Sequence, residues 1–206
     1  MSLSDNRIYL ASRSPRRREL LKQIGVSFEL LLLREDLRRG ADVDETPLPG
    51  EAPRDYVERV ARTKAEVAWR QVVSRALPPH PVLAADTTVI LDGEILGKPA
   101  DTQHAMAMLA RLSGRTHEVA TAVAVARRDR VEHRLSVSTV EFRRLEDFEI
   151  RRYATTGEPL GKAGAYAIQG RAAVFAASVT GSYTGIVGLP LYETAELLAK
   201  FDVIVP

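Results

Sequence analysis

The chain has 206 residues, of which 45% are hydrophobic, and it contains no cysteine. A chain of this length can bury about 70% of its unfolded surface, and the lack of cysteine excludes thiol catalysis, thiolate metal sites and disulfides. The net charge is only +2, and the arginines are interspersed with Asp and Glu, so neither nucleic acid nor a membrane is an expected partner.

The start at residues 1–7 is polar and carries no apolar h-region, and the densest apolar run, at residues 28–33, is too short to span a bilayer. We therefore expect a soluble cytoplasmic protein that forms a single domain over residues 1–206.

Short runs rich in Val, Ile and Leu alternate with stretches of helical periodicity, which predicts an α/β protein with a mixed sheet and flanking helices. Helices are predicted over residues 16–24, 51–73, 103–112, 146–155 and 190–201; the first follows Ser14 and Pro15, and the last begins on a proline. Strands are predicted over residues 8–11, 82–85, 116–126, 134–142 and 173–179, and a hairpin is predicted from residues 88–91 to 94–96. Asp86 is expected at the end of its strand.

The first polar cluster follows the first predicted strand, where residues 10–17 read Leu-Ala-Ser-Arg-Ser-Pro-Arg-Arg. The free N–H groups and the positive dipole end of the next helix favour an anion. Arginines in a first helical turn oppose that dipole at a cost of about 0.3 to 1 kcal/mol each, so their presence indicates a bound polyanion. The alternative is that Ser14 only caps the helix and that residues 16–18 form a solvated first turn.

The second cluster combines Ala-Ala-Asp-Thr-Thr at residues 84–88 with Gly-Lys-Pro at residues 97–99. Hydrolysis of a phosphoanhydride needs a base or a metal ligand to activate water and cations to hold the departing phosphates. Asp86 and Lys98 can supply both. The alternative is that the carboxylate of Asp86 only caps the next turn.

The third cluster is the glycine-rich stretch at residues 157–170, whose glycines permit close backbone approach and whose Gln169 amide can read the edge of a base. The alternative is a flexible surface connection. The apolar side chains of Tyr166 and Ile168 argue against it, because a solvated linker does not need them.

Taken together, these clusters resemble the signature of the Maf family of nucleoside triphosphate pyrophosphatases. The resemblance extends through Ser-Gly-Arg-Thr-His-Glu-Val at residues 113–119, Lys-Ala-Gly-Ala-Tyr-Ala-Ile-Gln-Gly at residues 162–170 and Val-Gly-Leu-Pro-Leu at residues 187–191, and so covers nearly the whole chain. It implies an α/β fold with two lobes around a nucleotide cleft, related to the inosine triphosphate pyrophosphatases and often dimeric. A homodimer is therefore a further expectation.

The form of residues 162–170 resembles the branch of the family that acts on dTTP and UTP, so the resemblance implies hydrolysis of these nucleotides to the monophosphate and pyrophosphate. In that correspondence Asp86 is the catalytic base, Gln169 marks the branch, and Arg16 and Thr87 help to set specificity. The residues expected to hold the triphosphate are Ser12, Arg17, Lys64 and Lys98.

The resemblance also implies a divalent metal ion, Mg²⁺ or Mn²⁺, which a triphosphate brings with it and which Asp86 can ligate. Glu45 is a second candidate ligand, with an exposed loop carboxylate as the alternative. Two departures from the family pattern are Arg13, where a small residue is common, and a longer stretch at residues 30–40.

Two other functions stay open at this stage. One is a related pyrophosphatase that prefers another base, and the other is a nucleotide-binding regulator of cell division without turnover. Because a binder gains nothing from a carboxylate that faces phosphate, Asp86 favours an enzyme. His117 is interpreted as a hydrogen-bond partner at a strand end rather than a general base.

Overall fold

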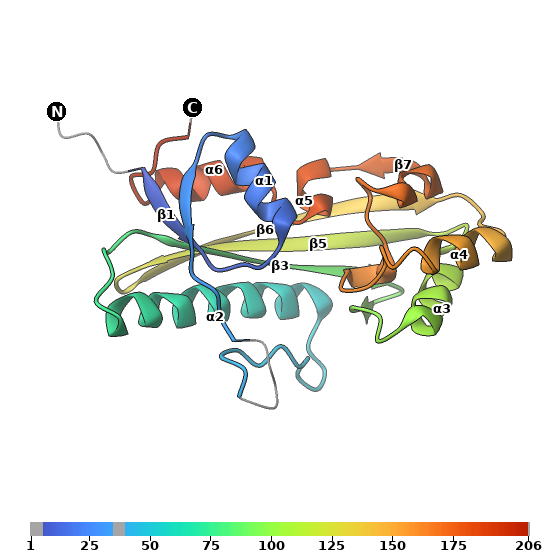
Figure 1. The fold of residues 1–206 in the computed structure, drawn as a ribbon, viewed down its shortest axis with the longest axis horizontal. Coiled ribbons are helices and arrows are strands. Elements are labelled where there is room, and N and C mark those ends of the chain that lie inside the picture. Colours follow the sequence, from blue (N-terminus) through green and yellow to red (C-terminus); the bar gives the residue numbers. More distant parts are fainter. Residues whose placement is uncertain (1–5, 35–39, 206) are drawn as a thin grey trace. The chain divides into compact units, whose positions relative to one another are not determined.

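The computed structural model describes residues 6–34 and 40–205. Over these residues the chain forms a mixed sheet of seven strands in the order β2-β1-β3-β5-β6-β7, with β4 paired to β3 and helices packed around the strands (Figure 1). The strands are β1 Arg7–Leu10, β2 Ser27–Leu30, β3 Val82–Leu91, β4 Glu94–Leu96, β5 Thr116–Arg127, β6 Arg130–Phe142 and β7 Ala176–Thr180. The helices are α1 Pro15–Gln23, α2 Pro53–Ser74, α3 Thr102–Leu112, α4 Asp147–Ala154, α5 Tyr183–Val187 and α6 Leu191–Ala199, and short 3₁₀ turns cover Ala163–Ala165 and Arg171–Phe175. The predicted α/β class is confirmed.

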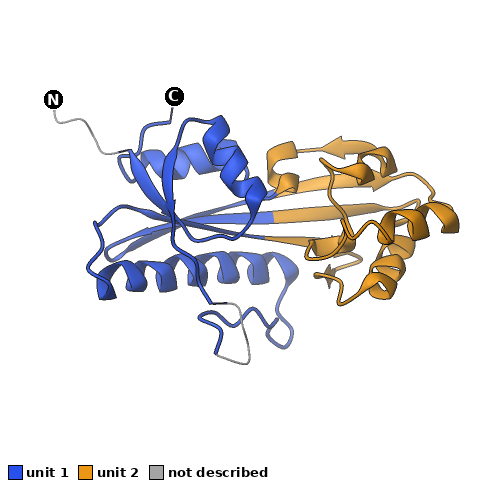
Figure 2. Ribbon diagram, in the orientation of Figure 1, with its two compact units in different colours: residues 1–86, 121–136, 188–206 blue, residues 87–120, 137–187 orange. Residues whose placement is uncertain are grey.

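The chain divides into two compact units, which Figure 2 shows in different colours. Unit 1 comprises Met1–Asp86, Thr121–Ser136 and Gly188–Pro206, and unit 2 comprises Thr87–Ala120 and Val137–Val187. Strands β3, β5 and β6 contribute residues to both units. Two units agree with the two lobes that the family resemblance implies, while a single family domain over residues 1–206 stays a prediction.

Unit 1 includes the parallel strands β1 and β2 and the start of β3, with helices on both faces. Strand β1 pairs in parallel with β2 and with β3, where Leu10 lies opposite Leu83. Helices α1 and α6 cover one face of this part of the sheet and α2 covers the other (Figure 1). The helix α2 buries one stripe at helical spacing, comprising Val57, Val60, Ala61, Ala65, Ala68 and Val72. Because Lys64 follows Val60 by four residues, it lies beside this stripe, and its side chain is only 14% exposed.

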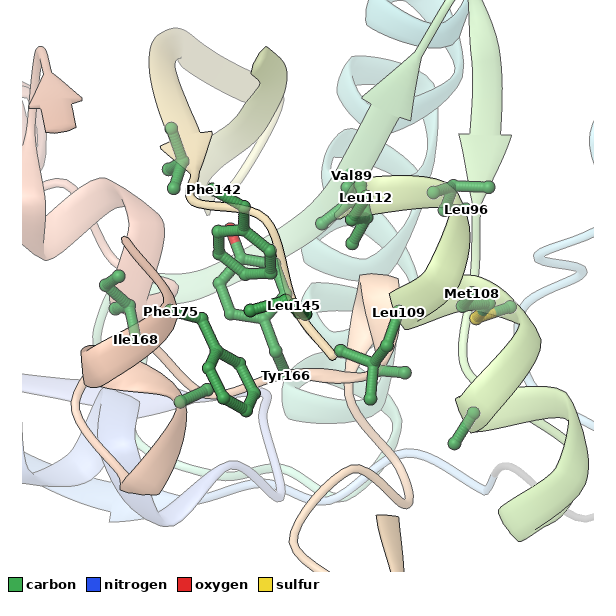
Figure 3. Packing of buried hydrophobic residues seen from close by; sticks show 14 of the residues in the cluster. Val89, Leu96, Met108, Leu109, Leu112, Phe142, Leu145, Tyr166, Ile168 and Phe175 are labelled. Carbon is green, nitrogen blue, oxygen red and sulfur yellow. The ribbon is translucent and has the colours of Figure 1, made fainter. Parts of the chain in front are cut away.

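Unit 2 has its own hydrophobic core, part of which Figure 3 shows. The rings of Phe142, Tyr166 and Phe175 meet edge to face, with 4.8 Å between the ring centroids of Phe142 and Tyr166. Tyr166 and Ile168 come from the glycine-rich stretch at residues 157–170 and are both buried. This stretch is therefore a part of the core, as its apolar side chains indicated.

The bounds of several predicted elements differ from the structure, and β6, predicted from residue 134, begins at Arg130. The strand expected to end at Asp86 continues to Leu91, so Asp86 lies inside β3; the polar pair Asp86 and Thr87 interrupts the apolar run without ending the strand. Residues 173–175 belong to a 3₁₀ turn, and β7 begins only at Ala176. Pro190 is the N-cap of α6 rather than its first residue. Strand β2 and the short helix α5 had no sequence prediction.

Candidate active site

The segment between β1 and α1 carries the first polar cluster. Ser12 is buried, and its hydroxyl oxygen accepts hydrogen bonds from the backbone N–H of Ser14 at 3.2 Å and from the Arg17 guanidinium at 3.1 Å. Ser14 is the N-cap of α1 by its extended backbone, but its side chain makes no capping bond. Since no acidic residue lies in the first turn, the positive dipole end of this helix has no negative side chain there to balance it.

Arg17 ties this segment to two distant parts of unit 1. Its Nε donates to the carbonyl oxygen of Gly188 at 2.8 Å, and its Nη1 donates to the carbonyl oxygen of Ala85 at 2.7 Å as well as to Ser12. Ala85 precedes Asp86 in β3, so Arg17 fixes the backbone next to the predicted catalytic base. Arg17 is also expected to contact the triphosphate, and this contact stays a prediction. Arg16 is half-buried in the same first turn.

Lys64 joins the two carboxylates that the sequence put forward as candidate metal ligands. Its Nζ lies 2.8 Å from Asp86 Oδ1 and 2.9 Å from Glu45 Oε1. The side chain of Asp86 is 13% exposed and that of Glu45 is 32% exposed. Because these side chains are partly buried, the Lys64 ammonium group strongly offsets the repulsion between the carboxylates of Glu45 and Asp86. The structure thus brings Glu45, Lys64 and Asp86 together from a loop, a helix and a strand.

The Tyr56 hydroxyl lies beside the same charges and donates a hydrogen bond to the backbone carbonyl of Glu45 at 3.1 Å. Burial, together with the negative charges of Asp86 and Glu45, raises the pKa of Tyr56 to about 12. Tyr56 therefore remains a neutral hydrogen-bond donor at neutral pH.

Unit 2 carries the other three predicted residues, Thr87, Lys98 and Gln169. Thr87 is half-buried in β3, and both Lys98 and Gln169 are exposed. The segment with Lys98 and the stretch with Gln169 are connected, because the backbone N–H of Gly164 donates to the carbonyl oxygen of Gly97 at 3.1 Å. Gln169 lies in a turn directly after the buried Ile168, so a packed neighbour anchors the backbone of an exposed amide.

The glycines of residues 157–170 serve the packing of unit 2. A Cβ at Gly164, whose φ is +66°, would lie 2.7 Å from Cγ2 of Val89. A Cβ at Gly170 would overlap the carboxylate of Glu158. That carboxylate accepts hydrogen bonds from the Tyr153 hydroxyl at 2.9 Å and from the Arg171 backbone N–H at 3.0 Å. At these two positions the glycines therefore let the backbone approach other side chains of the protein closely.

His117 is buried in unit 2, with its Nε2 at 2.8 Å from the Tyr166 hydroxyl. Burial lowers the pKa of His117 to about 4, so the ring is neutral at neutral pH. The interpretation of His117 as a structural hydrogen-bond partner is confirmed.

The two departures from the family pattern lie close to one another. Arg13 is exposed and donates through Nη2 to the carbonyl oxygen of Leu33 at 3.1 Å. Its guanidinium thus contacts the start of the longer stretch at residues 30–40. Residues 35–39 of that stretch lie outside the described residues.

The donor set of unit 1 fits a divalent metal ion that arrives on a nucleotide. Mg²⁺ is commonly held by one or two carboxylates together with substrate phosphates and water, and Glu45 and Asp86 are two carboxylates that already share one cation. Across the part of the chain that the structure describes, no group of three or more His, Asp or Glu side chains is placed to hold a metal.

Sequence reasoning gave no role to an ion pair next to Glu45. Arg59 on α2 contacts Glu51 through Nε at 2.6 Å and through Nη2 at 2.8 Å, and the Glu51 side chain is only 8% exposed. This bond to Arg59 lowers the pKa of Glu51 to about 2. The spacing of Glu51, Tyr56 and Arg59 before Lys64 is visible in the sequence, but it is also that of ordinary surface charges on an amphipathic helix.

Among the described residues, none of the helices combines the length and the hydrophobicity that a membrane crossing requires.

Comparison with known proteins gives a family over most of the chain. The model described as "Maf-like protein" matches residues 7–201. A "dTTP/UTP pyrophosphatase" of Aromatoleum aromaticum is 62% identical over 196 residues, which is 95% of each chain. Proteins of the same name from Nitrosomonas europaea and Chromobacterium violaceum are 58% and 52% identical, and the second is covered over its full length.

Two solved structures of Ham1 proteins are also similar. That of Staphylococcus aureus has a TM-score of 0.45 and 21% identity over 68% of this chain and 72% of its own, and that of Coxiella burnetii has a TM-score of 0.43 and 17% identity over 68% and 74%. With a family match over residues 7–201 and relatives more than half identical along nearly their whole length, this chain belongs to the Maf family.

Proposed function

We propose that this protein hydrolyses dTTP and UTP to the nucleoside monophosphate and pyrophosphate. The observation that carries the chemistry is the Asp86 carboxylate, which lies 2.8 Å from the Lys64 ammonium group and beside Glu45. A carboxylate oriented by a neighbouring cation can accept a proton from a water placed beside it. The names of the relatives in three bacterial species support the choice of nucleotide.

In this reaction Asp86 accepts a proton from the attacking water. The water oxygen forms a bond to the α-phosphorus, and the bond from that phosphorus to the oxygen bridging the α- and β-phosphates breaks. The electron pair of the broken bond leaves with pyrophosphate. Lys64 orients the Asp86 carboxylate, and the backbone of Asp86 is fixed through the bond from Arg17 to Ala85.

In this proposal the charges of the triphosphate are held by four side chains, which are Ser12, Arg17, Lys64 and Lys98. Glu45 and Asp86 would hold a divalent metal ion, either Mg²⁺ or Mn²⁺. When bound, that ion neutralises charge on the phosphates and on the departing pyrophosphate.

The choice of a pyrimidine base is assigned to Gln169, with Thr87 and Arg16 helping to set specificity. An amide offers both a donor and an acceptor, and so can pair with the edge of thymine or uracil. Because Ile168 is buried and anchors the turn, the Gln169 amide is presented from a fixed backbone.

The test is release of pyrophosphate from dTTP, UTP, CTP and 7-methyl-GTP with Mg²⁺ or Mn²⁺. The Asp86→Asn variant keeps the size of the side chain but removes the base, and we expect kcat to fall by at least about 100-fold. The matched control is Asp129→Asn, which changes an exposed aspartate of the turn between β5 and β6 and should retain full activity.

Each outcome decides a separate point. Turnover of 7-methyl-GTP alone would refute the role given to Gln169 and keep the enzyme. Folded protein that binds these nucleotides and releases them intact would refute the enzyme and favour a regulator.

We further propose that the protein acts in the cytoplasm as a homodimer, for which cell fractionation and light scattering are the direct measurements.

A further inference from the structure

We infer that Tyr56 and Arg59 are positioning residues, which hold the Glu45 segment so that the Glu45 carboxylate faces Lys64. This inference rests on the proposed function, because it assigns to the two residues an effect on that reaction. It concerns unit 1 alone, and every contact that it uses lies between residues 45 and 64.

The Glu45 segment, defined here as residues 41–52, needs such support. It contains no helix or strand, and it includes Pro47 and Pro49, which have no backbone N–H to donate. Of its larger apolar side chains, Val43 is buried, whereas Leu48 on the C-terminal side of Glu45 is 55% exposed. After Val43 the segment has no helix or strand and no buried apolar side chain, so its position around Glu45 depends on bonds from side chains.

Tyr56 supplies the first of these bonds. Its hydroxyl donates to the carbonyl oxygen of Glu45 itself at 3.1 Å, while the carboxylate of Glu45 meets Lys64 at 2.9 Å. The backbone and the side chain of one residue are thus held from two positions on α2, two turns apart. Phenylalanine at position 56 would remove the first bond and leave the second.

Arg59 supplies the second support, which acts on Thr46, the residue after Glu45. Its Nη2 donates to the carbonyl oxygen of Thr46 at 3.1 Å and to Glu51 Oε2 at 2.8 Å, while Nε contacts Glu51 Oε1 at 2.6 Å. The Glu51 carboxylate also accepts a hydrogen bond from the backbone N–H of Leu48 at 3.0 Å. Arg59 therefore fixes the segment on the C-terminal side of Glu45.

The two supports also contact each other. The guanidinium carbon of Arg59 lies 5.6 Å from the centroid of the Tyr56 ring, within the range of a cation–π contact. Lysine at position 59 would keep the positive charge but lose the planar two-point contact with Glu51. The pair therefore acts on Glu45 through its backbone, and neither residue needs to touch the nucleotide.

The experiment is a double-mutant cycle with Glu45→Gln. Tyr56→Phe and Arg59→Lys are each made in the wild-type protein and in the Glu45→Gln protein, and kcat and KM for dTTP are measured separately. The affinity for α,β-imido-dTTP, whose P–N–P link resists cleavage, is measured in the same proteins. Arg62→Lys is the matched control, because Arg62 is an exposed arginine one turn further along α2.

We expect each positioning variant to lower kcat/KM about 10-fold in the wild-type protein and less than about 2-fold once Glu45 is already replaced, since a residue acting through Glu45 has nothing left to position. Each positioning variant should change thermal stability by the same amount in both backgrounds. Arg62→Lys should change neither kcat/KM nor thermal stability. Equal losses of activity in both backgrounds would overturn the inference, because they would indicate a general structural effect.

Failure of the proposed function has a different signature. If the wild-type protein binds α,β-imido-dTTP but hydrolyses nothing, the proposed reaction is wrong, and the same cycle measured on binding affinity decides the positioning role. Absence of both turnover and binding in folded protein would overturn the two proposals together.

Discussion

The two units hold their candidate residues by different physical means. In unit 1, Glu45, Lys64 and Asp86 are held by charge and by hydrogen bonds, at the boundary of a stripe of small apolar residues on α2. In unit 2, Gln169 is carried by a stretch that is packed into an aromatic core. Substitutions in unit 1 should therefore reduce activity more than stability, and substitutions in the core of unit 2 should do the reverse.

The largest effect on stability is expected from Gly164→Ala, in unit 2. The new Cβ would lie 2.7 Å from Cγ2 of Val89, and alanine would have to adopt a φ of +66°. Left-handed strain of about 1 to 2 kcal/mol and overpacking of about 1 to 3 kcal/mol together predict a loss of about 4 kcal/mol in the free energy of unfolding. Urea denaturation measures this loss.

The matched control is Gly161→Ala in the same stretch. Its φ is +74°, but nothing lies within 4 Å of the added Cβ. Only the backbone strain remains, so the loss should be about 1 to 2 kcal/mol. Equal losses for the two variants would show that packing against Val89 does not hold this stretch.

The stability of unit 2 should also depend on pH through His117. Burial lowers the pKa of His117 to about 4 in the folded protein, from its ordinary value of 6.5. Between these values the unfolded chain binds a proton that the folded chain does not, so the free energy of unfolding falls as pH drops from 6.5 to 4. The full difference corresponds to about 3 kcal/mol.

The measurement is urea denaturation at a series of pH values, for the wild-type protein and for His117→Gln. Glutamine can still bond to the Tyr166 hydroxyl but does not titrate. We expect the variant to be less dependent on pH over this window, and an unchanged dependence would assign it to other groups.

The sequence was most informative where a local signal decides the structure. Ser14 and Pro15 mark the start of α1 because an extended N-cap and a proline suit the first turn. The polarity of Asp86 and Thr87 misled the prediction of β3, since a carboxylate inside a strand looks like a strand end in the sequence. Motif resemblance suggested Lys64 and Asp86, but no spacing along the chain indicates that Lys64 also meets Glu45.

The contacts of Arg17 were equally invisible, because its partner Gly188 lies 171 positions away. The same holds for residues 157–170, where a pattern rich in glycine does not reveal that Gly164 packs against Val89. Local chemistry predicts where a helix begins, whereas the closeness of distant residues follows only from the tertiary fold.

A stability effect smaller than those expected at Gly164 and His117 tests the other side of the comparison, at Arg17 in unit 1. Arg17→Lys keeps the charge but cannot reach the carbonyl oxygens of Gly188 and Ala85 and the hydroxyl of Ser12 with one planar group. We expect a loss of about 2 kcal/mol in the free energy of unfolding, because buried acceptors lose a charged donor.

Activity should fall further than this stability loss explains, since the bond to Ala85 fixes the backbone next to Asp86. The comparison is with Arg18→Lys, one residue along α1, which should retain both stability and turnover. If Arg17→Lys lowered stability and left kcat/KM for dTTP unchanged at a temperature where it is fully folded, the bond to Ala85 would serve the fold of unit 1 alone, and the difference between the two units would not extend to this residue.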